Sequence, residues 1–237
     1  MAKQGNILNL VVQRFPPGWR YGAIIDGDFH MTRRDWALEA IHQLQHYDFV
    51  QLFFRLFGSF RRALSLPRDA ELRIQLREWS REFGLSSEAS HRSRRSAFDA
   101  VGGLLDVCIL GSADWHMAFG LVGAVDAPSE LQWCSKPYVE AVLRWQERAA
   151  LLKRNIGYVD NHAIHYFHGS KVSRSYGSRW HILLDNKYDP RTDISRDWQG
   201  VYQFTGNKPR LRDDIRGYFR DRNEDSPELS PQERHII

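Results

Sequence analysis

The sequence predicts an α/β fold, and three observations support this prediction. Helical and strand-like patterns alternate over residues 6–56, as they do in α/β proteins. A short apolar run, Tyr21-Gly-Ala-Ile-Ile, stops abruptly at Asp26 and Asp28, which is typical of a buried strand followed by a turn. The composition, with 42% hydrophobic and 13% aromatic residues, is sufficient for an ordinary core.

Proline and the apolar runs set the expected elements of the first half of the chain. Pro16 and Pro17 stop a helix over 6–15, because proline restricts the residue before it and cannot continue a helix. The further expected elements are a strand over 23–25, a helix over 36–46, a strand or buried segment over 49–56, an amphipathic helix over 71–79, and an exposed or mobile loop over 86–95.

The second half of the chain is expected to begin with a helix over 98–105 that ends at Gly102-Gly103. A long helix follows over 138–154. Two strands over 155–159 and 163–168 are expected to pair around a turn at Asp160-Asn161. A last helix is expected over 179–186.

Length and composition suggest one domain over 1–222, with an Arg-rich insertion or loop region over 55–95 and a disordered tail over 223–237. The net charge of +4 permits an anionic ligand but does not require nucleic acid. Cys108 and Cys134 are expected to be reduced, buried thiols. With no apolar leader and no membrane-length apolar run, we expect a soluble cytoplasmic protein without a membrane span.

The acidic pair Asp26 and Asp28 is the first candidate for chemistry. Carboxylates at the end of a strand lie where open α/β sheets place their ligands. Mg²⁺ and Mn²⁺ prefer oxygen ligands, and one or two carboxylates often bridge such a cation to substrate phosphates. The alternative is a polar turn that Asp28 caps, because Asp favours turns.

Two later motifs follow the acidic pair in a fixed order. They are Gly111-Ser-Ala-Asp-Trp-His-Met and His165-Tyr-Phe-His-Gly. Taken together, the three motifs resemble glycosyltransferases of the GT-A fold, close to the family-two type, and the resemblance covers about residues 6–225. It implies a truncated GT-A-like, Rossmann-like mixed sheet flanked by helices, a nucleotide-sugar donor, and Mn²⁺ or Mg²⁺ as cofactor.

The resemblance also implies roles for individual residues. Asp28 binds the metal that bridges the donor diphosphate, with His168 as a second metal ligand, and Asp26 faces the ribose or the metal. Asp114 is the general base that accepts the proton of the acceptor hydroxyl. The remaining implied contacts are Lys171 and Arg174 with the donor phosphates, and Trp115 and His116 with the acceptor. The sequence does not identify the acceptor, for which a glycan and a modified nucleic acid are two candidates.

Each role has a structural alternative. Asp114 stands before a helical stretch, where Asp is often an N-cap. Trp115 suits a core position, and a histidine such as His168 is often a satisfied structural residue. Lys171 and Arg174 suit a solvated basic loop.

Only 25 residues precede Asp26, whereas GT-A folds begin with strands that form the nucleotide pocket ahead of the acidic motif. The resemblance therefore implies a partner chain that completes the sheet, a trimmed variant, or a degenerate relative. An unpaired sheet edge recruits other chains, so we expect a homo-oligomer or an obligate partner. Two rival functions follow: a non-catalytic scaffold subunit, and a metal-dependent enzyme acting on nucleic acid through the Arg-rich stretch.

Overall fold

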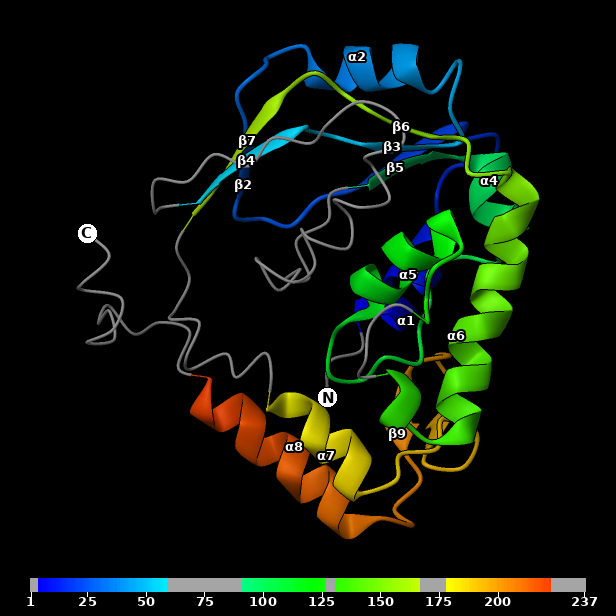
Figure 1. Ribbon diagram of the computed structural model, residues 1–237, viewed down its shortest axis with the longest axis vertical. Helices are drawn as coiled ribbons and strands as arrows, with labels where there is room; N and C mark the ends of the chain where they lie inside the picture. Colours follow the sequence, from blue (N-terminus) through cyan, green and yellow to red (C-terminus); the bar gives the residue numbers. More distant parts are fainter. Residues whose placement is uncertain (1–3, 59–90, 127–130, 167–177, 223–237) are drawn as a thin grey trace.

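The computed structural model describes residues 4–58, 91–126, 131–166 and 178–222. It is a mixed α/β structure in which two sheets lie together at one end and a helical pair lies at the other (Figure 1). This confirms the expected fold class at the level of mixed α/β.

A four-stranded sheet has the order β1-β5-β3-β6. Its strands are β1 (Tyr21–Ile24), β3 (Phe49–Gln51), β5 (His91–Arg94) and β6 (Ile156–Tyr158). Strand β5 is antiparallel to both β1 and β3, and β6 is parallel to β3. Strands β1, β3 and β6 therefore run in one direction, and their carboxyl ends share one edge of the sheet. Among the described strands, β1 forms the outer edge of this sheet.

A three-stranded sheet has the order β2-β7-β4. It contains β2 (Phe29–Met31), β4 (Arg55–Gly58) and β7 (His162–His165). Strand β7 is antiparallel to β2, with Phe29 opposite His165, and parallel to β4. The chain crosses from one sheet to the other between β1 and β2, which is where the two aspartates stand.

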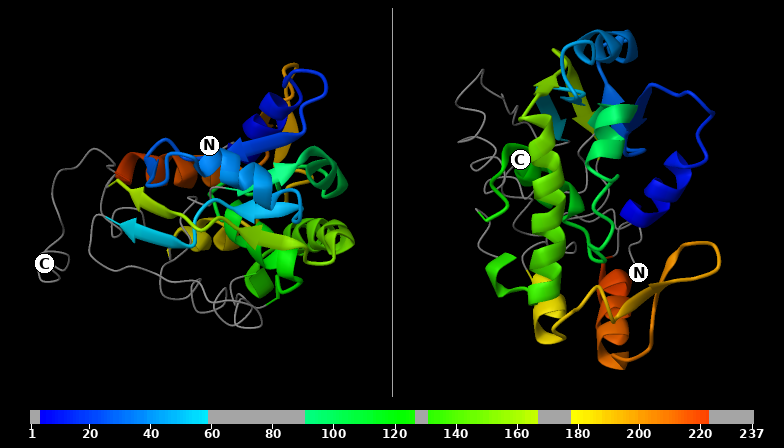
Figure 2. Two further views of the ribbon diagram at one scale, coloured as in Figure 1. Left: turned by 90° about the horizontal axis from the view of Figure 1, so that it is seen from above. Right: turned by 90° about the vertical axis from the view of Figure 1, so that its right-hand side faces the viewer.

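Helices cover both faces of the sheets (Figures 1 and 2). Helix α2 (Trp36–Gln43) packs on one face, where a small apolar cluster includes Ala40, Leu44, Val50 and Phe53. The larger cluster lies on the other face and includes residues of the remaining helices except α1. The remaining helices are α1 (Gln4–Val12), α4 (Arg95–Ala100), α5 (Ala113–Val122), α6 (Lys136–Ala149), α7 (Arg179–Asp185) and α8 (Pro209–Asp221), with the 3-10 turns η1 (Leu131–Trp133) and η2 (Ala150–Leu152).

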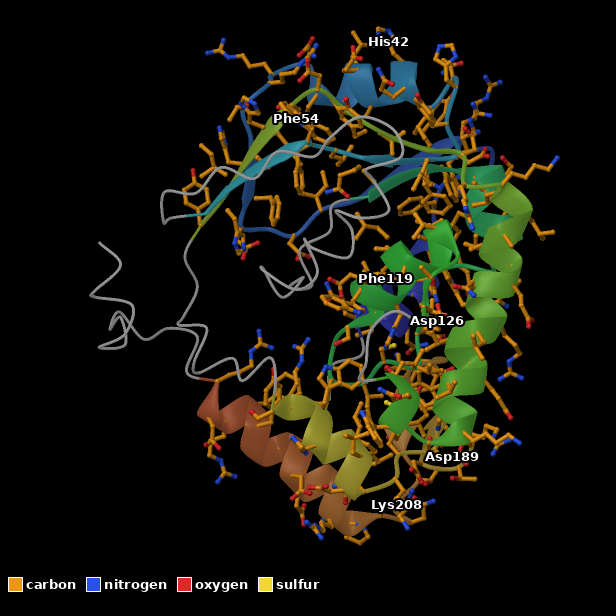
Figure 3. The ribbon with its side chains drawn as sticks, viewed as in Figure 1. His42, Phe54, Phe119, Asp126, Asp189 and Lys208 are labelled. Atoms are coloured by element: carbon orange, nitrogen blue, oxygen red, sulfur yellow. The ribbon has the colours of Figure 1, made fainter. Side chains whose placement is uncertain are left out.

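The C-terminal part forms a separate brace at the end opposite α2. It consists of α7, α8 and the hairpin of β8 (Ile194–Arg196) and β9 (Tyr202–Phe204). Figure 3 shows Asp189 and Lys208 at this end and His42 of α2 at the other. The buried carboxylate of Asp193 organises the brace, because it lies 2.8 Å from Lys208 Nζ and 2.7 Å from the backbone nitrogen of Asp189.

Two sequence-based expectations are wrong. The loop expected over 86–95 contains β5, an inner strand of the four-stranded sheet. The strands β6 and β7 do not pair around Asp160-Asn161, because each joins a different sheet. His162 accordingly begins strand β7 and does not lie on a turn.

The polar segment before α4 forms a strand because its backbone pairs on both sides and its last side chain finds partners. The guanidinium of Arg94 donates to the carbonyl oxygen of Leu44 at the end of α2. It also lies 3.9 Å from Asp48. Pairing between distant segments thus outweighs the weak strand propensity of the sequence.

Smaller differences concern boundaries. The segment expected over 49–56 divides into β3 and β4, which belong to different sheets. The expected helices near 6–15, 36–46, 138–154 and 179–186 are present with shifted ends. Helix α4 ends just before Gly102 and Gly103, which have φ of +75° and +82°. The helix expected over 71–79 and the tail over 223–237 lie outside the described residues.

Within the described parts of the chain, no helix is both long and apolar enough to cross a membrane.

Candidate functional site

The two aspartates form a tight turn at the junction of the sheets. The backbone nitrogen of Phe29 donates to the carbonyl oxygen of Asp26 at 3.2 Å, which closes the turn. The backbone nitrogen of Tyr166 donates to the carbonyl oxygen of Asp28 at 2.9 Å and ties the turn to the end of β7. A polar turn and a ligand site are therefore compatible here, because backbone groups close the turn and the carboxylates make separate contacts.

Asp28 contacts His165, a histidine that was not predicted as a site residue. The Oδ2 atom of Asp28 lies 3.2 Å from Nε2 of His165. The register of β2 and β7 produces this contact, because it sets Phe29, the residue after Asp28, opposite His165. The side chains are 29% and 14% exposed, so the pair is largely shielded but remains open on one side.

The resemblance to GT-A enzymes predicts His168 of the His-Tyr-Phe-His-Gly motif as the metal ligand. His168 lies outside the described residues, as do Lys171 and Arg174. Strand alternation gave a usable signal for His165: it placed His165 and His168 on opposite faces. What it lacked was the identity of the partner strand, which decides which face meets Asp28.

The side chain of Asp26 contacts other residues than Asp28 does. Its Oδ1 atom lies 3.4 Å from Nε2 of Gln4 on α1. It also lines a cavity of about 100 Å³ together with Asp114. The turn between the sheets thus places Asp28 beside His165 and Asp26 beside the cavity that contains Asp114.

Asp114 lies in the first turn of α5, after a sharp change of chain direction. Gly111 has φ of +94° and Ser112 has φ of +67°, and the latter is the N-cap residue of the helix. A left-handed conformation costs free energy for a residue other than glycine and is found preferentially at functional sites. Asp114 is not the N-cap that the structural alternative proposed; it stands one residue inside the helix start.

The carboxylate of Asp114 is poorly solvated. Its Oδ2 atom is sealed from solvent and accepts no hydrogen bond from any residue that the structure describes. Burial raises the pKa of Asp114 to about 7. The backbone amides of residues 114 and 115 and the charge of Arg179 lower this pKa, but their combined effect is smaller than that of burial.

Arg179, the first residue of α7, connects the helical brace to this turn. Its Nη2 atom donates to Oγ of Ser112 at 3.1 Å. A Cβ atom on Gly111 would lie 3.1 Å from Nη1 of Arg179, so the glycine permits the close approach of the guanidinium. The arrangement places a cation near Asp114, and its charge favours the ionised carboxylate.

The two residues expected at the acceptor lie mainly in the core. His116 is 1% exposed, and its Nε2 atom lies 3.2 Å from the hydroxyl oxygen of Tyr138. Burial lowers the pKa of His116 to about 3, so the imidazole is neutral at physiological pH. Trp115 is half-buried and packs against Phe119, with ring centroids 5.4 Å apart. We therefore leave His116 out of the site, and the acceptor role of Trp115 stays a prediction.

The cavity beside Asp114 lies between α1, β1, α4 and α5. Its lining is mostly apolar and includes Leu8, Val12, Phe98, Met117 and Trp145. Its lining also includes the polar side chains of Gln4, Asp26 and Asp114, and Nε2 of Gln4 lies 3.4 Å from Oδ1 of Asp26. A ligand in this cavity would have its polar group beside the carboxylates and its remaining surface against hydrocarbon.

The donor atoms permit a metal site that substrate completes. In the described parts of the chain, no three His, Cys, Asp or Glu residues cluster closely enough to hold a metal by themselves. Asp28 and His165 supply one carboxylate and one imidazole. Cations that act on phosphates commonly take only one or two protein carboxylates and receive their other ligands from phosphate and water, so the pair fits this kind of site.

No family model, curated protein or solved structure matches this chain.

Proposed function

We propose that this protein is a metal-dependent glycosyltransferase that moves a sugar from a nucleotide-sugar donor to an acceptor hydroxyl. The observation that carries the proposal is the acidic turn after β1. It places Asp28 against His165 and Asp26 beside the cavity of Asp114. A site for a metal-bridged diphosphate and a candidate base are thus neighbours at the carboxyl end of β1, the edge where α/β sheets bind ligands.

Asp28 and His165 would hold Mn²⁺ or Mg²⁺ against the diphosphate of the donor. The cation, when bound, offsets the negative charge that develops on the leaving diphosphate. Asp28 supplies the anionic oxygen, and His165 supplies a nitrogen donor when its Nε2 atom is unprotonated. Asp26 is placed to orient the donor, and Lys171 and Arg174 remain candidate phosphate contacts.

Asp114 would accept the proton of the acceptor hydroxyl. A general base works best when its pKa lies near the operating pH, and burial brings the pKa of Asp114 to about 7. Arg179 favours the ionised form, which is the form that can accept a proton. The unsatisfied Oδ2 atom is the one available to a ligand hydroxyl.

The first test is donor binding by calorimetry, with a panel of nucleoside diphosphates in the presence of Mn²⁺ or Mg²⁺. Wild-type protein should bind one of them in a metal-dependent manner, and Asp28→Ala should abolish this binding. Asp35→Ala is the matched control, because Asp35 is 57% exposed and pairs with Arg33 on the outside of the fold. Equal binding by Asp28→Ala and wild type would refute the metal assignment.

The second test is transfer. Asp114→Asn should retain metal-dependent nucleotide binding and lose transfer by ~10²–10⁴, the usual contribution of general acid–base catalysis. Near-normal transfer by a folded Asp114→Asn protein would refute the assignment of the base.

One observation favours a second candidate function, a non-catalytic subunit that needs a partner. Strand β1 is at the edge of the described sheet, although the GT-A resemblance implies that the acidic motif ends a central strand. A donor-hydrolysis assay with and without candidate partner proteins separates the two functions. A protein that binds donor but never turns it over with any partner would favour the subunit.

A further inference from the structure

The cavity beside Asp114 has the wrong lining for a sugar. A sugar presents hydroxyl groups on all sides, and each one that is buried without a hydrogen bond costs free energy. Here Gln4, Asp26 and Asp114 are the amide and acidic side chains of the lining, and most of the remaining wall is formed by apolar side chains such as Leu8, Phe98 and Met117. An occupant of this cavity must therefore be apolar over most of its surface and polar at one point.

Asp114 indicates where the polar group of the occupant would lie. Its Oδ2 atom is shielded from solvent and accepts no hydrogen bond from the described residues. A buried acceptor of this kind is costly unless a ligand satisfies it. Gln4 and Asp26 line the same cavity and their side chains lie 3.4 Å apart, so they add polar groups to its wall.

The size of the cavity limits the occupant. Its volume is about 100 Å³. An apolar cavity of roughly 150 Å³ is known to hold benzene, so this one suits a single ring or a short branched alkyl group. The wall includes Phe98 and Trp145, which offer flat apolar surfaces.

We propose that the acceptor of the glycosyl group is a hydroxyl carried by a compact apolar group, an alkyl or aryl alcohol, that enters this cavity with its hydroxyl at Asp114. This inference rests on the proposed function in one respect: the alcohol is an acceptor only if the protein transfers a glycosyl group. The binding of such an alcohol does not require that function. The transfer of the ring or alkyl group from water into the apolar cavity supplies affinity. The hydroxyl group donates a hydrogen bond to the carboxylate of Asp114.

The test measures binding to the full-length chain in the absence of donor and metal. Saturation-transfer NMR and thermal shift are the two measurements. The probes are benzyl alcohol, toluene and glucose at millimolar concentration. Benzyl alcohol should bind and raise the melting temperature, toluene should bind more weakly, and glucose should not bind. Binding of glucose at least as strong as that of benzyl alcohol would overturn the proposal.

A cavity-filling variant localises the binding. Ala23 of β1 lines the cavity, so Ala23→Leu should weaken benzyl alcohol binding at least tenfold. Ala150→Leu makes the same change at an exposed position outside the cavity and should bind as wild type does. If Ala23→Leu does not fold, Leu8→Phe fills the same space from α1. Unchanged binding by a folded cavity-filling variant would place the alcohol elsewhere and overturn the proposal.

The polar end is tested separately. Asp114→Asn should weaken benzyl alcohol more than toluene, because only the alcohol donates a hydrogen bond to the carboxylate. An equal effect on both probes would overturn the assignment of the hydroxyl to Asp114. If benzyl alcohol binds as expected but no alkyl or aryl alcohol is glycosylated with any nucleotide-sugar donor, the proposed function fails and the alcohol site stands.

Discussion

One carboxylate oxygen of Asp28 lies 3.2 Å from Nε2 of His165, although 137 residues separate the two in the sequence. The contact depends on two features that the backbone determines. The acidic turn carries the chain from one sheet into the other, and the register of β2 with β7 then sets the residue after Asp28 opposite His165. The metal assignment can therefore be tested from the histidine side as well.

Replacing His165 with Ala should weaken the metal-dependent binding of a nucleoside diphosphate about 10- to 100-fold, as the loss of a metal's protein contacts commonly does. Isothermal calorimetry measures this effect. His162→Ala is the matched control, because His162 lies on the same strand and packs on Phe54 with ring centroids 5.2 Å apart. Equal losses in the two variants would indicate damage to β7 and not the loss of a ligand.

Asp114→Asn should raise stability at neutral pH. Burial raises the folded-state pKa of Asp114 from 3.8 to about 7, so the folded protein holds this proton where the unfolded chain has released it. Between these two values the contribution of Asp114 to stability falls as pH rises. A shift of this size corresponds to at most a few kcal/mol, and we expect Asn to gain about 2 kcal/mol at pH 8.

Thermal melts of both proteins across pH measure this effect. The difference in melting temperature should be about 4–8 °C at pH 8 and should vanish near pH 4, where Asp114 is protonated in the folded protein. A variant that is less stable than wild type at pH 8 would contradict the buried, poorly solvated carboxylate.

His116 should contribute to acid sensitivity. Its pKa is lowered from 6.5 to about 3 in the fold, so the folded protein stays neutral here while the unfolded chain takes up a proton. The contribution is therefore fully present above pH 6.5 and is lost as pH falls toward 3.

His116→Gln removes the titration and keeps a side chain that can reach the hydroxyl of Tyr138. Denaturant titrations from pH 7 to pH 4 should show a stability loss in wild type that is smaller in the variant, by about 2–3 kcal/mol at pH 4. Identical pH profiles would show that the unfolded state does not gain this proton.

The outer strand β1 should promote association. An unpaired edge presents backbone donors and acceptors to another chain, so we expect a homo-oligomer or a complex with an obligate partner. Multi-angle light scattering at micromolar concentration measures the mass. A monomer that retains full donor affinity would contradict this prediction, because donor binding would then not require another chain at the edge formed by β1.

The sequence predicted the elements that depend on local signals. Pro16 and Pro17 stop α1, and Gly102 and Gly103 follow α4 in left-handed conformations that favour glycine. The apolar run before Asp26 forms β1 as expected. In these cases a single stretch of chain contains the information, and tertiary contacts only add to it.

Pairing between distant segments was not predictable in the same way. Strand β5 has a polar sequence, and it forms because β1 and β3 flank it and Arg94 reaches Leu44 and Asp48. The partners of β7 decide that His165 faces Asp28, and no property of residues 162–168 alone reveals those partners. The burial of His116 also depends on Tyr138, which lies on another helix.

The central position of β5 has a consequence for how this chain is made. A ribosome releases β1 and β3 early, but neither can acquire its neighbour until residue 94 has emerged, and β6 completes the sheet only after residue 158. Non-local pairing of this kind slows folding and leaves unpaired strands exposed in the meantime. Until residue 158 has emerged, the nascent chain therefore exposes unpaired strands in the sheet whose edge carries the acidic turn.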